Sequence, residues 1–149
     1  MGRIEHKVIK HQLVANKTPG TEDIHPSGFS GDCGLTLIEM APYGVIGSIT
    51  PSTNPSETVI CNSIGMIAAG NGVVFNPPPN AIATSNYAID LVNRASKAMG
   101  GPEILVCSMK KPTLESASIM QSHPAIRLLV CTGGPGVVRA VLSSGKKAI

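Results

Sequence analysis

The feature that most constrains this chain is an alternation of short apolar runs and helix-forming segments from residue 35 to residue 149. Continuous apolar runs between helices are typical of strands covered on both faces, as in parallel sheets. With the right-handed crossover rule, the pattern predicts an α/β fold: a Rossmann-like, doubly wound, mostly parallel sheet with helices on both faces. The expected strands are 36–40, 44–49, 72–75, 103–107, 127–131 and 147–149, and the expected helices are 54–70, 80–99, 113–122 and 135–144.

The chain divides into two parts by composition. Residues 1–34 are polar and contain turn signals at 18–20 and 27–28, which predict a helical N-terminal piece followed by an irregular connector. Residues 35–149 are expected to form one α/β domain, since a chain of 149 residues has room for one substantial core. Within it, Asn54 is expected to cap a helix, with Pro55 at the first helical position and Glu57 completing a capping box.

Charge and composition exclude several kinds of protein. A net charge of +3 and an aromatic content of 3% give no basic, aromatic-rich surface for nucleic acid. No apolar stretch approaches the length of a membrane span, and the start does not read as a secretory signal. The four cysteines (Cys33, Cys61, Cys107 and Cys131) are far apart and form no metal-ligand pattern with the histidines. Buried thiols in a reducing cytoplasm are the expected state, with no metal site.

Three loops are expected at the carboxyl ends of the strands, where ligands bind in such sheets. The first contains Thr50, Pro51, Ser52, Thr53 and Asn54 and leads into a helix. Exposed backbone N–H groups and the helix dipole suit an anion or a developing oxyanion at this place. The alternative is that Asn54 serves only as a helix cap, which is a common role for asparagine.

The second expected loop contains Asn76, Pro77, Pro78 and Pro79. Three consecutive prolines give a stiff extended segment with few donors, which suits a flat wall beside a ribose or an adenine ring. A rigid connector without a ligand would have the same sequence.

The third expected loop runs through Thr132, Gly133 and Gly134 to Pro135. Its glycines permit close approach of the backbone to a diphosphate, and Thr132 adds a hydroxyl donor. The segment departs from G-x-G-x-x-G because Arg139 stands at the last glycine position. A tight turn with a proline in the first helical turn remains the alternative.

The chain contains no convincing Cys–His or Ser–His–Asp set, and none of its cysteines lies in a loop suited to nucleophilic attack. Cys131 comes nearest, just before the glycine loop, but structural burial is the favoured interpretation. The catalytic chemistry is therefore incomplete in these residues.

Several runs resemble the CoA-acylating acetaldehyde and propionaldehyde dehydrogenases of ethanolamine and propanediol utilisation. Residues 41–55 read APYGVIGSITPSTNP, and 67–75, 129–135, 144–147 and 16–23 match further blocks of that family in the same order. The resemblance implies an oxidoreductase that converts an aldehyde, NAD+ and coenzyme A into acyl-CoA, NADH and a proton. In that chemistry a cysteine thiolate attacks the aldehyde, and coenzyme A resolves the thioester after hydride transfer.

The resemblance also implies roles for the residues of the three loops. An oxyanion-donating asparagine matches Asn54 by residue type, whereas alignment between the flanking prolines matches it to Thr53. Residues 76–79 match the adenosine-ribose wall, without the Lys and Glu that ordinary aldehyde dehydrogenases use there, and Pro78 replaces a histidine common in acylating relatives. The loop and helix start beside the diphosphate match Thr132, Gly133, Gly134 and Val137. The expected cofactor site also includes Thr50, Pro51, Ser52 and Thr53.

Members of the resembling family are several hundred residues long, so 35–149 is expected to be a truncated dinucleotide-binding domain. The catalytic cysteine and the oligomerisation domain would lie outside it, and the 149-residue chain would be inactive alone. The resemblance implies a homo-oligomer for the intact enzyme, in the cytoplasm, and allows encapsulation in a bacterial microcompartment. The alternative hypothesis is a non-catalytic nucleotide-binding or assembly module with the same fold.

Overall fold

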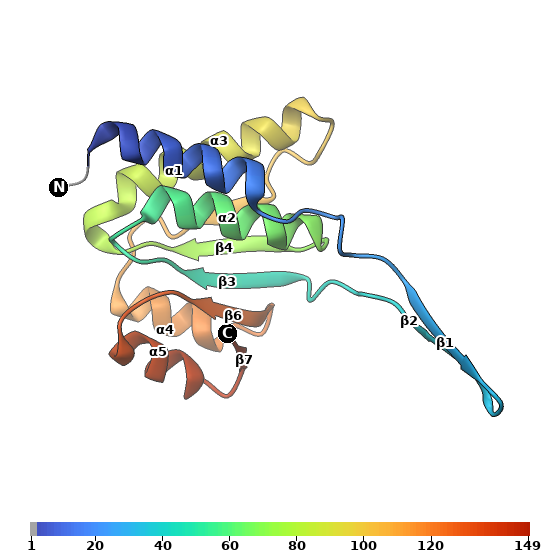
Figure 1. Cartoon of the computed structure of the whole chain (residues 1–149). Coiled ribbons are helices and arrows are strands. Elements are labelled where there is room, and N and C mark those ends of the chain that lie inside the picture. The colour runs from blue at the N-terminus through green and yellow to red at the C-terminus, as the bar shows by residue number, and fades with distance from the viewer. Residues whose placement is uncertain (1–2) are drawn as a thin grey trace.

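The computed structural model describes residues 3–149 and contains one five-stranded sheet, one separate hairpin and helices on both faces of the sheet (Figure 1). The chain begins with α1 (Ile4–Lys17) and the hairpin strands β1 (Ser27–Gly31) and β2 (Gly34–Ile38). The remaining elements are β3 (Val45–Ile49), α2 (Pro55–Ala68), β4 (Gly72–Asn76), the 3-10 turn η1 (Pro79–Ala81), α3 (Ile82–Ala98), β5 (Val106–Ser108), α4 (Leu114–Ser122), β6 (Ile126–Cys131), α5 (Pro135–Leu142) and β7 (Lys147–Ala148).

The five strands of the main sheet are all parallel and lie in the order β5-β4-β3-β6-β7. The chain moves outward from β3 to β4 and β5, then crosses to the other side of β3 to build β6 and β7. Helices α2 and α3 cover one face and α4 and α5 cover the other (Figure 1). This confirms the predicted Rossmann-like, doubly wound α/β fold, and it places the reversal of strand order between β3 and β6.

Two apolar clusters hold the helices to the sheet. On one face, Val59 of α2 and Ile89 of α3 pack with Phe75 of β4, which is fully buried. On the other face, Met120 of α4 and Val141 of α5 pack with strand residues that include Ile49, Ile126 and Leu129. Burying a large aliphatic side chain stabilises the fold by roughly 1.5–3 kcal/mol. The core is therefore aliphatic, as the low aromatic content requires.

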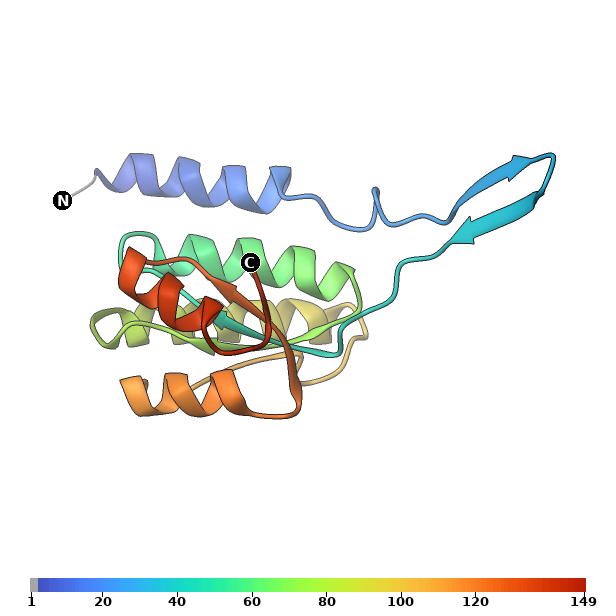
Figure 2. The same cartoon turned by 90° about the horizontal axis from the view of Figure 1, so that it is seen from below.

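The segment before the sheet differs from the sequence prediction. Strands β1 and β2 pair antiparallel, with Ser27 opposite Ile38 and Gly31 opposite Gly34, so the expected irregular connector is wrong for Ser27–Gly31. A Ser/Gly-rich strand has weak local preference, and pairing with β2 overrides it. The proposed division at residue 35 falls inside this hairpin. Figures 1 and 2 show the hairpin projecting from the body, with every residue of both strands exposed.

Candidate functional site

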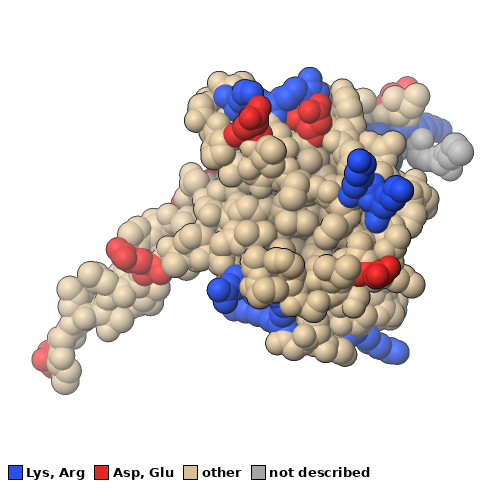
Figure 3. All heavy atoms as spheres, turned by 180° about the vertical axis from the view of Figure 1, so that it is seen from behind, with Lys and Arg blue, Asp and Glu red and all other residues tan. Residues whose placement is uncertain are grey.

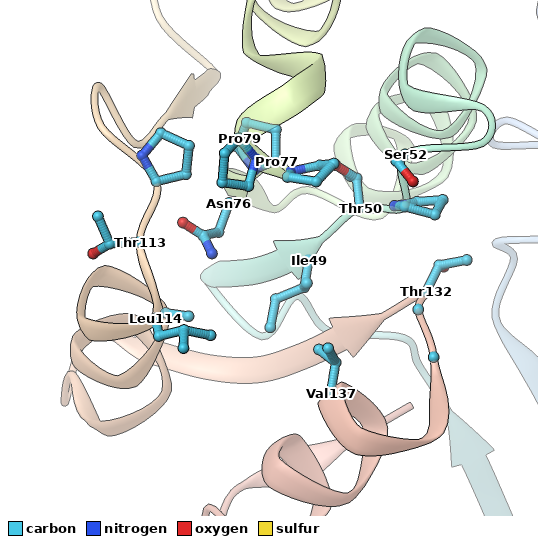
Figure 4. Close-up of a pocket in the computed structure, with 16 residues that line it drawn as sticks. Ile49, Thr50, Ser52, Asn76, Pro77, Pro79, Thr113, Leu114, Thr132 and Val137 are labelled. Carbon is cyan, nitrogen blue, oxygen red and sulfur yellow. The ribbon is translucent and has the colours of Figure 1, made fainter.

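A cavity of about 330 Å³ opens at the carboxyl ends of β3, β4 and β6, beside the start of α4 (Figure 4). This is the point where strand order reverses, the usual place for a ligand in such a sheet. Its lining is uncharged throughout and consists of Ile49, Thr50, Pro51, Ser52, Asn76, Pro77, Pro78, Pro79, Pro112, Thr113, Leu114, Ala117, Thr132, Gly133, Gly134 and Val137. All the expected cofactor residues except Thr53 are therefore brought together around one space.

The glycine loop forms one wall of the cavity. The backbone N–H of Thr132 donates to the carbonyl of Ile49 at 3.0 Å, which holds this loop against the end of β3. Gly134 lines the cavity, and a Cβ atom added there would meet nothing within 4 Å. The backbone can therefore approach a ligand closely here, which is what a diphosphate requires.

The proline loop forms the opposite wall. Pro77 is fully buried, Pro78 is half-buried and Pro79 is exposed at the start of η1. Asn76, the last residue of β4, is 7% exposed, and its Oδ1 accepts a hydrogen bond from Ser116 Oγ at 3.1 Å. The wall thus combines rigid apolar rings with one fixed amide.

Thr50 contributes a buried hydroxyl at the base of the cavity. The residue is 3% exposed, and Oγ1 has no hydrogen-bond partner among residues 3–149. Ser63 and Ser85 have buried hydroxyls in the same state away from the cavity, so the Thr50 hydroxyl does not by itself indicate a ligand. The room beside Gly134 and the uncharged walls fit a dinucleotide.

Thr53 and Asn54, the two candidates for the oxyanion donor, lie outside the cavity lining. Thr53 Oγ1 donates to Asn54 Oδ1 at 2.9 Å, so that oxygen is already engaged. Asn54 occupies the N-cap position of α2, but its side chain makes no capping hydrogen bond. The predicted capping role of its side chain is therefore wrong, because Thr53 takes the oxygen that would cap the helix.

The expected capping box of α2 is also wrong, because Glu57 bonds elsewhere. Glu57 is 2% exposed and its Oε1 lies 2.9 Å from Lys7 Nζ of α1. Ser56 Oγ donates to Glu57 Oε2 at 3.1 Å, and His11 Nε2 lies 2.8 Å from Ser56 Oγ. Lys7 Nζ also reaches the carbonyl of Thr53 at 3.5 Å. Helix α1 thereby holds the first turn of α2 next to the Thr53–Asn54 segment.

The burial and the hydrogen-bond partners of Glu57 both affect its pKa. Burial alone raises it, but hydrogen bonds from Lys7, from the backbone and from Ser56, together with the charge of Lys7, outweigh burial and hold it below the ordinary value of 4.5. The carboxylate is therefore charged at neutral pH and is a partner for Lys7 throughout the physiological range.

None of the four cysteines lines the cavity. Partial burial raises the pKa of the Cys131 thiol, so it stays protonated and is a poor nucleophile. The prediction that all the thiols are buried is wrong for Cys33 and Cys107, which are exposed. Cys33 lies in the turn of the projecting hairpin, and Cys107 lies in β5 at the edge of the sheet.

The sequence prediction missed the part of the wall that precedes and begins α4, formed by Pro112, Thr113, Leu114 and Ala117, and it also missed Ile49. Thr113 caps α4, since its side chain accepts from the Ser116 N–H at 3.0 Å. In a parallel sheet the helix after β5 must start at the same edge as the other loops. That rule could have indicated from the sequence that the start of α4 joins the site. Leu114 stands at the rim and is 91% exposed.

Among residues 3–149, no helix is both long and apolar enough to cross a membrane. In the same residues, no three His, Cys, Asp or Glu side chains gather in a way that would hold a metal ion.

Comparison with known proteins gives the same family throughout. The model of the aldehyde dehydrogenase family matches residues 13–149. The chain is 54% identical over 138 residues to an acetaldehyde dehydrogenase (acetylating) of Bilophila wadsworthia, which covers 93% of this chain and 28% of that protein. A propionaldehyde dehydrogenase from the Clostridium phytofermentans fucose utilisation bacterial microcompartment is 64% identical, with a TM-score of 0.96 over 100% of this chain and 34% of its own. An engineered glycolyl-CoA reductase with bound NADP+ is 56% identical, with a TM-score of 0.94 and the same coverage. The chain thus spans about a third of the length of these relatives.

Proposed function

Because this chain belongs to the aldehyde dehydrogenase family, we propose that its cavity binds the NAD+ of an enzyme that oxidises a short-chain aldehyde and transfers the acyl group to coenzyme A. The observation that carries the proposal is the uncharged cavity at the reversal of strand order, with a glycine wall on one side and a proline wall on the other. The acetylating and propionaldehyde-oxidising relatives support the choice of reaction.

Each wall has a proposed part in binding. The half-buried ring of Pro78 and the exposed ring of Pro79 present an apolar surface for the adenosine, and Asn76 offers the one fixed polar group beside them. The backbone of Gly133 and Gly134, which line the cavity, approaches the diphosphate. Apolar walls also exclude water, which strengthens each of these hydrogen bonds. When bound, the nicotinamide supplies the hydride-accepting chemistry.

The proposed assignment for the oxyanion donor is Asn54, with Thr53 as the alternative. Thr53 Oγ1 donates to Asn54 Oδ1 at 2.9 Å, which directs the Nδ2 donor of the amide the other way. Lys7 supports this segment through the carbonyl of Thr53. Such a donor stabilises negative charge that develops on the aldehyde oxygen during thiol attack.

The nucleophilic thiol is proposed to lie outside residues 1–149, because none of the four cysteines lines the cavity. The 149-residue chain is therefore the cofactor side of the reaction and is inactive by itself. The proposed substrates of the whole enzyme are the aldehyde and coenzyme A, as the names of the acylating relatives support.

The β1–β2 hairpin is proposed to take part in a homo-oligomer. Its strands expose Phe29, Leu35, Leu37 and Ile38, each between 42% and 68% exposed. Figure 3 shows the extension as a mostly uncharged surface. The hairpin is separate from the five-stranded sheet, and its exposed apolar side chains are suited to contact with a second chain. The proposed location is the cytoplasm, within a bacterial microcompartment as for the fucose-utilisation relative.

Titration calorimetry of the 149-residue chain with NAD+ tests the proposal. Saturable binding of one NAD+ per chain, without NADH formation when aldehyde and coenzyme A are added, is the expected result. Absence of binding at millimolar NAD+ would sink the cofactor assignment, and turnover by the pure chain would sink the assignment of the nucleophile to residues outside it.

A further inference from the structure

Ser116 and Asn76, which are 40 residues apart in the sequence, meet at the edge of the cavity. Asn76 ends β4, and Ser116 lies in the first turn of α4. Ser116 Oγ donates to Asn76 Oδ1 at 3.1 Å. The contact thus joins the start of a helix to the one polar side chain of the proline wall.

The capping box of α4 holds Ser116 in place for this contact. Its Oγ accepts from the backbone N–H of Thr113 at 2.8 Å, and its own N–H donates to Thr113 Oγ1 at 3.0 Å. The carbonyl of Thr113 lies 3.0 Å from the same hydroxyl, as a second acceptor for its one hydrogen. The hydroxyl is therefore fixed on three sides.

A carboxamide whose oxygen is bound at α4 must turn its nitrogen the other way. Figure 4 shows the oxygen of Asn76 on the side of Thr113 and its nitrogen on the side of Ile49. Among residues 3–149, no acceptor bonds Asn76 Nδ2. The cavity therefore contains a hydrogen-bond donor that the protein itself leaves free.

We propose that Ser116 is a positioning residue that presents Asn76 Nδ2 as a donor to the adenosine ribose, so that the cavity accepts a dinucleotide with or without a phosphate on that ribose. The inference rests on the proposed cofactor site. A carboxylate at this place would accept from a free 2′-hydroxyl and repel a 2′-phosphate; a neutral donor bonds the oxygen of either group.

The charges around the cavity also suit a dinucleotide that carries a phosphate on its ribose. No Asp or Glu lines the cavity, so nothing in its wall repels a phosphate. Lys110 and Lys111 directly precede Pro112 in the wall and are exposed. Within residues 3–149, neither lysine makes an ion pair.

Parallel titrations of the 149-residue chain with NAD+ and NADP+ test the inference. For the unmodified chain the two dissociation constants are expected to agree within about fivefold, because no charged side chain in the cavity wall distinguishes the ligands. In Ser116→Ala the amide of Asn76 is free to turn its oxygen inward. The dissociation constant of NADP+ should then rise about threefold to tenfold more than that of NAD+, the value of one hydrogen bond.

Three further variants separate positioning from simple structural support. Ser116→Thr keeps the hydroxyl and should keep the ratio of the two constants. Ser118→Ala, an exposed position on the same helix, should leave both constants unchanged. Asn76→Asp should weaken NADP+ by about tenfold or more relative to NAD+, because it places a negative charge beside the phosphate. Unfolding midpoints check that each variant is folded.

The outcomes separate the two proposals. An equal rise of both constants in Ser116→Ala would mean that Ser116 only stabilises α4, and it would overturn the inference. NADP+ binding to the unmodified chain that is weaker than NAD+ by more than about thirtyfold would overturn it too, while leaving the cofactor site intact. Failure of both dinucleotides to bind would overturn the cofactor site itself and the inference with it.

Discussion

Lys7 Nζ lies 2.9 Å from Glu57 Oε1, and this ion pair joins α1 to the first turn of α2. Glu57 is 2% exposed, whereas the side chain of Lys7 is 44% exposed. A second cation, Lys10, stands 3.9 Å from the same oxygen. Helix α1 has no buried residues of its own. The ion pair therefore anchors α1 to the first turn of α2, directly after the loop that leaves the cavity.

Lys7→Met is expected to lower the free energy of unfolding by about 2 kcal/mol, because it removes a charged hydrogen bond from a buried carboxylate. Lys10→Met is the matched control and should cost less than half as much, since Lys10 is farther from Glu57. Urea unfolding of both variants measures the difference. Equal losses would contradict the assigned role of Lys7.

The same carboxylate predicts a pH dependence. The folded-state pKa of Glu57 is held below the ordinary value of 4.5, so the stabilisation is complete above that value. It is lost as the pH falls through the lower folded-state pKa. Unfolding free energies of the unmodified chain and of Glu57→Gln, measured between about pH 6 and about pH 3, should converge toward the acid end. A difference in unfolding free energy that stays constant over this pH range would contradict the stabilising role of the Glu57 carboxylate.

Gly47→Ala is expected to destabilise the fold by about 1 kcal/mol through overpacking. Its added Cβ would lie 3.0 Å from Leu129 Cδ2, 3.1 Å from Ile126 Cγ2 and 3.2 Å from Met120 Cγ, all in the buried cluster between β3 and α4. Gly31→Ala is the control, since a Cβ there meets nothing within 4 Å. Thermal unfolding should show a lower midpoint for the first variant only; a midpoint raised by Gly47→Ala would refute the packing argument.

Gly134→Ala is expected to weaken NAD+ binding by about tenfold without loss of stability. Gly134 lines the cavity, an added Cβ meets no protein atom within 4 Å, and the backbone there (φ −71°) suits any residue, so the methyl group is expected to obstruct the diphosphate and not the fold. Gly136→Ala, two residues further on and outside the cavity lining, should leave binding unchanged. Calorimetry of the pair measures both effects. Equal affinities for the two variants would place the diphosphate elsewhere.

Much of the fold could be predicted because local signals agree with the tertiary arrangement. The apolar run of β6 and the proline at the start of α5 both mark elements that the structure contains. The hairpin could not be predicted in full, because Ser27–Gly31 has neither apolar alternation nor β-branched residues. Its strand forms through pairing with β2 across a tight turn, and the residues of β1 alone do not indicate that pairing.

The candidate site also has parts that could be predicted from the sequence and parts that could not. The loops after β3, β4 and β6 could be predicted from their position and from their glycines and prolines. The contact of Ser116 with Asn76 could not be predicted, because the two residues are 40 positions apart and no sequence motif links them. The partner of Glu57 was missed for the same reason: a capping box is a local signal, whereas Lys7 reaches Glu57 from a different helix.

NAD+ is proposed to occupy the cavity between the glycine wall and the proline wall. Amide chemical-shift mapping of the 149-residue chain during titration with NAD+ tests it most directly. The account predicts that the shifts concentrate at Thr50, Asn76, Thr132, Gly133 and Gly134, while the hairpin and the outer face of α1 stay unchanged. Shifts confined to the hairpin or to α1, or no shifts at saturating NAD+, would contradict it.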